Sequence, residues 1–123
     1  MREMSMPTIE LQIFSPRWGH DDTYEIELER DHMEITRGAN TARADWQDNA
    51  DPAWSGWTVE GMMGNDSIHP PAVTQRMFQR VWTAWRGGEV DDAQAEAELQ
   101  ALADWINAVT RAKPRTDFWR AYF

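Results

Sequence analysis

The chain has 123 residues, 41% of them hydrophobic, no cysteine and a formal net charge of −9 at pH 7. The lack of cysteine excludes disulfide bonds, thiolate metal sites and cysteine nucleophiles. A chain of this length is typical of one domain built around one core, so we expect residues 1–123 to form a single domain.

The negative charge is concentrated in the first half of the sequence. Residues 1–60 hold 13 acidic and 5 basic side chains, a net charge of −8, whereas residues 61–123 hold 8 and 7, a net charge of −1. Such a surface repels phosphate, so we expect no nucleic-acid partner and favour basic or cationic ones, although the charge also serves solubility. No apolar run approaches 18 residues and no secretory signal begins the sequence, so we expect a cytoplasmic protein with no membrane partner.

Alternating apolar and polar residues predict strands in the first third of the chain. The alternation is clear over residues 9–13, 23–29 and 33–36, and weaker over residues 41–46. Short connections between these segments predict an antiparallel meander of three to four strands with one face covered. From residue 47 to residue 71 the periodicity is lost, apart from one helical turn expected near residues 58–63. A stretch of this kind is either functional or loosely structured.

The second half of the sequence predicts a helical hairpin. Pro70 and Pro71 suit the first turn of a helix, Gly87 and Gly88 end it, and Asp91 with Gln94 resembles a capping pair for the next helix. The expected fold class is therefore α+β, with the antiparallel meander packed against a C-terminal helical hairpin.

The aromatic surface of this second half predicts self-association. Apolar residues cover an arc of about 180° on the first helix, which requires two packing partners, and four of the last six residues are aromatic. We therefore expect a homodimer or a higher homo-oligomer. The interface residues predicted on this basis are Phe78, Trp82, Trp85, Phe118, Trp119, Tyr122 and Phe123.

Acidic and aromatic side chains in the first half predict a binding site. Glu10, Glu25, Glu27, Glu29 and Glu34 should emerge on the outer face of the sheet, where like charges repel unless salt, Arg37, Arg43 or a cationic ligand offsets them. Carboxylates beside tryptophan rings also suit a cation. We expect a non-catalytic binding module for a cationic small molecule or a basic protein. The predicted ligand-binding residues are Arg17, Trp18, His20, Asp22, Glu25, Glu27, Trp46, Trp54 and Trp57.

The alternative is a small enzyme that uses the loop of His20, Asp21 and Asp22 for acid-base or metal chemistry. Neighbouring Asp side chains on a strand point to opposite faces, and neither His32 nor His69 has a spacing that ensures convergence. No nucleophile, phosphate-binding or dinucleotide motif occurs either. We therefore expect a hairpin turn here, with no catalytic residue, metal or cofactor. An acidic antitoxin that neutralises a basic toxin is a third class compatible with the charge.

Three stretches carry a resemblance to a known family: "SPRWGHDDTYEIEL", "NDSIHPPAVTQ" and "AKPRTDFWRAYF". The chain resembles small proteins encoded on integron gene cassettes, over residues 9–123, and the Pro-Arg-Trp-Gly-His-Asp-Asp and Asp-Phe-Trp-Arg blocks are the most specific parts. The resemblance implies an α+β domain and a mobile accessory gene of a bacterium. It implies no role for Arg17, His20 or Asp22, and the adaptive traits common among cassette genes are only an association of context.

Overall fold

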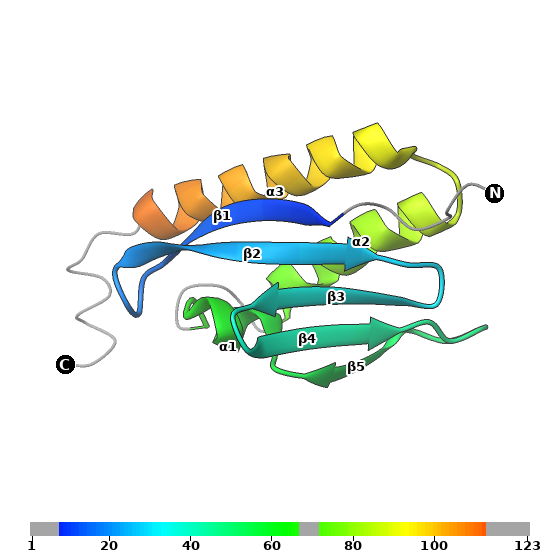
Figure 1. Cartoon of the computed structure of the whole chain (residues 1–123), viewed down its shortest axis with the longest axis horizontal. Helices are drawn as coiled ribbons and strands as arrows, with labels where there is room; N and C mark the ends of the chain where they lie inside the picture. The colour runs from blue at the N-terminus through cyan, green and yellow to red at the C-terminus, as the bar shows by residue number, and fades with distance from the viewer. Residues whose placement is uncertain (1–7, 67–71, 113–123) are drawn as a thin grey trace.

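A five-stranded antiparallel sheet with helices packed on one of its faces forms the computed structural model of the chain (Figure 1). The structure describes residues 8–66 and 72–112. Neighbouring strands in the sheet follow one another in the sequence, in the order β1-β2-β3-β4-β5, which confirms the antiparallel meander and the α+β class. The elements are β1 (Ile9–Ser15), β2 (His20–Leu28), β3 (His32–Arg37), β4 (Asn40–Asp45), β5 (Ala53–Gly56), α1 (Val59–Met63), α2 (Val73–Arg86) and α3 (Asp92–Ala112).

The fifth strand and a short helix lie in the segment that has no periodicity. Strand β5 pairs with β4, placing Trp54 opposite Ala44, and it has only four residues, too few to show an alternating pattern. Gly56 ends β5 with a φ of +81°, and a Cβ there would lie 2.3 Å from the Thr41 carbonyl oxygen, so the position requires glycine. The expected helical turn is confirmed as α1, where the side chain of Thr58 accepts a hydrogen bond from the Gly61 N–H.

The core lies between the sheet and the helices; in Figure 1, α2 passes behind the strands and α3 runs alongside β1. In β1, in the second half of β2, and in β3 and β4, buried apolar residues alternate with more exposed polar ones, as the sequence predicts. The opposite face of the sheet carries the polar members of each strand. The largest fully buried side chains of the described residues include Trp82, Tyr24, Phe78, Leu11, Ile13, Ile26, Leu28 and Met33.

Helix α2 satisfies its wide apolar arc within the chain, which corrects part of the predicted oligomer interface. Phe78 and Trp82 are both 0% exposed, and the Trp82 indole N–H donates to the Glu29 carbonyl at 2.8 Å. Trp46 packs edge-on against Trp82, with ring centroids 5.7 Å apart. Helix α2 packs against α1 and α3, and Phe78 and Trp82 belong to the same buried cluster as the core residues of the strands, so these two side chains are core residues and not surface residues. The predicted interface residues Phe118, Trp119, Tyr122 and Phe123 lie outside the described residues.

Side-chain caps set where α2 and α3 begin. The buried carboxylate of Glu60, in α1, accepts hydrogen bonds from the backbone N–H groups of Thr74 and Gln75 in the first turn of α2. At α3 the predicted capping pair is confirmed: Asp91 accepts from the Gln94 N–H at 2.8 Å, and Gln94 accepts from the Asp91 N–H at 2.9 Å. Pro70 and Pro71 lie outside the described residues.

Asn107, in α3, fastens the helix to the edge strand β1. Its Oδ1 accepts from the backbone N–H of Phe14 at 2.7 Å, and its Nδ2 donates to the carbonyl of Gln12 at 2.9 Å. These backbone groups point away from β2, where an edge strand has no neighbour to pair with. One amide therefore joins α3 to the sheet and satisfies the exposed edge at that point.

Replacing Asn107 by Ala should lower the free energy of unfolding by about 1 to 3 kcal/mol, because two backbone groups lose their partners. Chemical denaturation followed by circular dichroism measures the change. Gln100→Ala is the matched control, since the Gln100 amide bonds to Asp104 of the same helix and not to the sheet. Equal effects of the two substitutions would contradict a stabilising role for the contact with β1.

Candidate functional site

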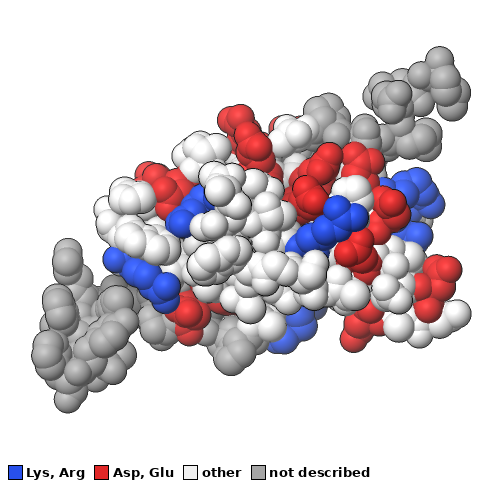
Figure 2. All heavy atoms as spheres, turned by 60° about the horizontal axis from the view of Figure 1, so that its bottom comes forward, with Lys and Arg blue, Asp and Glu red and all other residues white. Residues whose placement is uncertain are grey.

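The uncovered face of the sheet carries rows of carboxylates. We call Glu10, Glu25, Glu27 and Glu34 the acidic face; Glu10 lies directly opposite Glu25, and Glu27 directly opposite Glu34. Figure 2 shows Asp and Glu side chains gathered on one part of the surface, with basic side chains among them. Like charges in directly opposed positions repel one another. The face therefore stores electrostatic strain that a cation would relieve.

Arg43 relieves part of this repulsion. Its guanidinium lies 2.9 Å from the Glu34 carboxylate and 3.0 Å from the Asp45 carboxylate. Hydrogen bonds to Asp45 and then to Glu34 raise the pKa of Arg43 above its ordinary value. Arg37, the other arginine expected to offset the glutamates, instead pairs with Asp22. Among the described arginines, Arg43 is thus the one that pairs with the acidic face, at Glu34.

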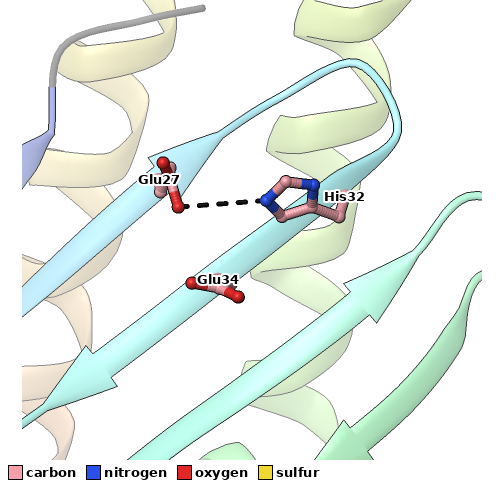
Figure 3. Close-up of side chains that lie close together, drawn as sticks. All are labelled: Glu27, His32 and Glu34. Carbon is pink, nitrogen blue, oxygen red and sulfur yellow. Dashed lines mark ion pairs between the residues drawn. The ribbon is translucent and has the colours of Figure 1, made fainter.

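The side chain of His32 lies close to two members of the acidic face, Glu27 and Glu34 (Figure 3). Single ligand atoms of Glu27, His32 and Glu34 all lie within 4.8 Å of one another, and His32 Nε2 is 3.9 Å from a Glu27 carboxylate oxygen. The other ring nitrogen, Nδ1, lies 2.8 Å from the carboxylate of Asp31. This hydrogen bond is the main reason why the pKa of Asp31 is lowered. The group is the one set of described residues with the spacing of a three-ligand metal site.

The turn that carries Trp18 forms a second cluster, at the end of the sheet where β1 joins β2. Asp22 pairs with both His20, at 3.1 Å, and Arg37, at 3.3 Å. The Arg37 guanidinium lies 4.6 Å from the Trp18 ring centroid, while Arg17 lies 5.5 Å from it. Four of the predicted ligand-binding residues, Arg17, Trp18, His20 and Asp22, are therefore brought together, but they already have partners within the chain: Arg37, one another and, for Arg17, Asp66 at 2.9 Å.

The three side chains of the enzyme alternative do not converge. Asp22 lies opposite Ile13 on the core side of the sheet, whereas Asp21 pairs with Arg111 of α3. The two neighbouring Asp side chains therefore have separate basic partners, Arg37 for Asp22 and Arg111 for Asp21. His20 is 60% exposed and has Asp22 as its ion-pair partner. This arrangement is that of a turn tied to its surroundings.

The predicted tryptophan site is divided between the two ends of the sheet. Trp18 lies in the β1–β2 turn, whereas Trp46 follows β4 at the opposite end, next to the position where Asp45 pairs with His32. Arg86 lies 3.8 Å from the Trp46 ring centroid, and the Trp54 indole donates to Gln79 at 2.8 Å. Trp57 is half exposed. The chain's own arginines therefore cover ring faces that a shared cation cage would need.

The sequence interpretation placed Glu34 on the acidic face but left it out of the ligand-binding residues, and it missed His32 and Asp31 as site residues. The signal was present in part, because His32 and Glu34 are two positions apart on one strand and must share a face. The strand register cannot be predicted from the alternation, and it is the register that places Glu27 of β2 directly opposite Glu34. Glu25 and Glu27 were predicted, and both lie on the uncovered face.

A family model described as integron cassette protein matches residues 7–110. The chain therefore belongs to this family of cassette-encoded α+β proteins. Among solved structures it is similar to VCH_CASS3, an integron cassette protein from the mobile metagenome of V. cholerae, with 48% sequence identity and a TM-score of 0.82. The similarity covers 97% of this chain and 94% of the relative. A search of curated proteins found no match.

The comparisons confirm the predicted family, and they assign it no activity. Among the described residues, no helix has the length and apolar character needed to cross a bilayer. The candidate sites are therefore the acidic face and, at one end of it, the group of Glu27, His32 and Glu34. In the cluster at the β1–β2 turn, the charged side chains pair with one another.

Tyr24, beneath the turn cluster, gives a pH-dependent prediction. Burial raises the pKa of Tyr24 to about 12 despite the nearby Arg37, and its hydroxyl lies 3.3 Å from the Met62 carbonyl oxygen. The unfolded phenol ionises near pH 10. Stability from this group is thus fully present below pH 10 and is lost as pH rises toward 12, by about 2 to 3 kcal/mol.

Absorbance of the phenolate during an alkaline titration measures this shift. The chain has two tyrosines, so Tyr122→Phe leaves Tyr24 as the single reporter. We expect its ionisation to coincide with loss of the folded state, above pH 10. Reversible ionisation near pH 10 with the fold intact would contradict the effect of burial.

Proposed function

We propose that this cassette protein is a non-catalytic binding module whose acidic face receives the basic surface of a protein partner. The observation that carries the proposal is the register of the sheet, which opposes Glu10 to Glu25 and Glu27 to Glu34 on a face that no described helix covers. Binding a cationic surface removes this repulsion, so the face has a favourable electrostatic term for basic partners.

The shape of the surface favours a protein over a small cation. A sheet face is broad and open, whereas small molecules are held in concave sites that bury most of their surface. The aromatic residues expected to enclose a small cation are separated, and Trp18 and Trp46 already contact arginine. A basic protein needs no cage, because exposed charges act mainly on orientation and on the association rate.

The test measures binding of a deca-lysine peptide, a generic basic probe, by titration calorimetry at about 50 and about 200 mM salt. The double variant Glu10→Gln/Glu25→Gln removes one opposed pair and leaves Glu27 and Glu34 unchanged. We expect about fivefold weaker binding and a smaller salt dependence, because each exposed charge contributes a fraction of a kcal/mol to about 1 kcal/mol.

The matched control is Glu96→Gln/Glu98→Gln, which changes the net charge equally on exposed positions of α3. Binding that depends on the acidic face should be weakened by the first double variant and not by the second. Equal weakening by both would show that the peptide responds only to net charge, and would overturn the proposal.

A further inference from the structure

We propose that Glu27, His32 and Glu34 form a binding site for a divalent transition metal, with Zn²⁺ as the ion that the ligand set fits best. The site lies at the end of the acidic face where β2 turns into β3. Metal binding here goes beyond the proposed function and does not depend on it.

The three ligands are positioned by the backbone of the β2–β3 hairpin. His32 and Glu34 stand two residues apart on β3 and therefore project from the same face of the sheet. Glu27, on β2, lies directly opposite Glu34. Figure 3 shows Glu27 and His32 reaching toward each other across the hairpin, with Glu34 beside them. Because two hydrogen-bonded strands hold all three residues, only side-chain rotation is needed to bring them around an ion.

The distances suit a small adjustment of this kind. The ligand atoms lie within 4.8 Å of one another, and His32 Nε2 is 3.9 Å from Glu27 Oε1. Two ligands of a tetrahedral zinc ion at bond lengths of about 2.0 to 2.2 Å are separated by about 3.3 to 3.6 Å. Rotation of the two glutamate side chains, which are 43% and 29% exposed, closes this gap.

The donor atoms select among ions. One imidazole nitrogen and two carboxylate oxygens are common ligands of zinc, whereas Ca²⁺ and Mg²⁺ require six or more oxygen ligands in total. A divalent ion also neutralises the two glutamates that the register forces into opposition. The fourth zinc position is left for water.

Asp31 holds the imidazole in the orientation that a metal ligand needs. Its carboxylate lies 2.8 Å from His32 Nδ1, so Nδ1 carries the proton and Nε2 presents its lone pair toward the glutamates. A carboxylate behind a ligating histidine is the usual outer-shell partner in zinc sites. The His32 side chain is 18% exposed, which limits its rotation and preserves this arrangement.

The other charges around the site set its affinity. Arg43 competes for Glu34, but it also holds Asp45 and can remain paired there when Glu34 turns to the metal. Asp45 lies opposite His32 on β4, and Glu29 directly follows β2. These additional carboxylates strengthen the negative potential around the metal.

Zinc binding is tested with full-length, tag-free protein freed of metal by chelation. Competition with a chromophoric zinc chelator measures the affinity, and we expect one Zn²⁺ per chain. His32→Gln should weaken binding at least 100-fold and Glu34→Gln at least tenfold, because each removes a ligand. Asp31→Asn, which alters a positioning residue, should weaken it about tenfold. Substituted Co²⁺ should show the intense visible absorption of a low-coordinate site.

Two histidines provide matched controls, because the chain has three in all. His20→Gln and His69→Gln should leave zinc affinity unchanged, as should Glu10→Gln/Glu25→Gln, which tests the proposed function separately. Glu27→Gln, at the more exposed ligand, is the second ligand variant if His32→Gln does not fold. Lack of binding at about 100 μM Zn²⁺, or binding that survives substitution of the ligands, would overturn the site.

Discussion

The structure depends on the fact that helices cover only one face of its antiparallel sheet. Side chains alternate between the two faces, so the choice of which residues meet the helices also decides which residues meet water. Burial of Tyr24, Ile26 and Leu28 therefore requires that Glu25 and Glu27 stand on the other side. The acidic face is a direct consequence of the way in which the core is built, and the register then sets carboxylate against carboxylate.

Arginine resolves some of these charges and leaves others open. At the β1–β2 turn, Arg37 pairs with Asp22 and lies over Trp18, so an aromatic ring, a carboxylate and a guanidinium stabilise one another. Arg43 performs a related role at Glu34. The opposed pair of Glu10 and Glu25 has no such ion-pair partner among the described salt bridges. Charge is thus balanced inside the turns and left unbalanced on the open sheet, which is where partner binding is proposed.

Much of the fold could be predicted because each prediction rested on local periodicity or capping chemistry. Four strands, the hairpin of helices and the pairing of Asp91 with Gln94 follow from residues that are neighbours in sequence. Strand β5 could not be found in this way, because its four residues carry no distinct alternation. The arc of α2 was recognised, but an apolar arc does not reveal its partner, and Phe78 and Trp82 are covered by the chain itself.

The candidate sites show the same limit. Alternation identified the face on which Glu25 and Glu27 stand, whereas convergence of Glu27 with His32 and Glu34 depends on register and on a hairpin turn. The tryptophans predicted to share a site lie apart for a related reason: sequence proximity to irregular segments did not distinguish the two ends of the sheet. Trp18 and Trp46 are consequently held by different arginines, Arg37 and Arg86.

The amide of Asn107 also affects how copies of the chain can meet. Since it occupies the outward backbone groups of Gln12 and Phe14, a strand from another molecule cannot extend the sheet there without breaking both hydrogen bonds. Among the described strands, the other edge is β5, which offers only four residues. Pairing of sheet edges between molecules is therefore obstructed at β1, and at β5 it is limited to four residues. The protein can thus expose a broad sheet face without the fibre-forming tendency that long open edges bring.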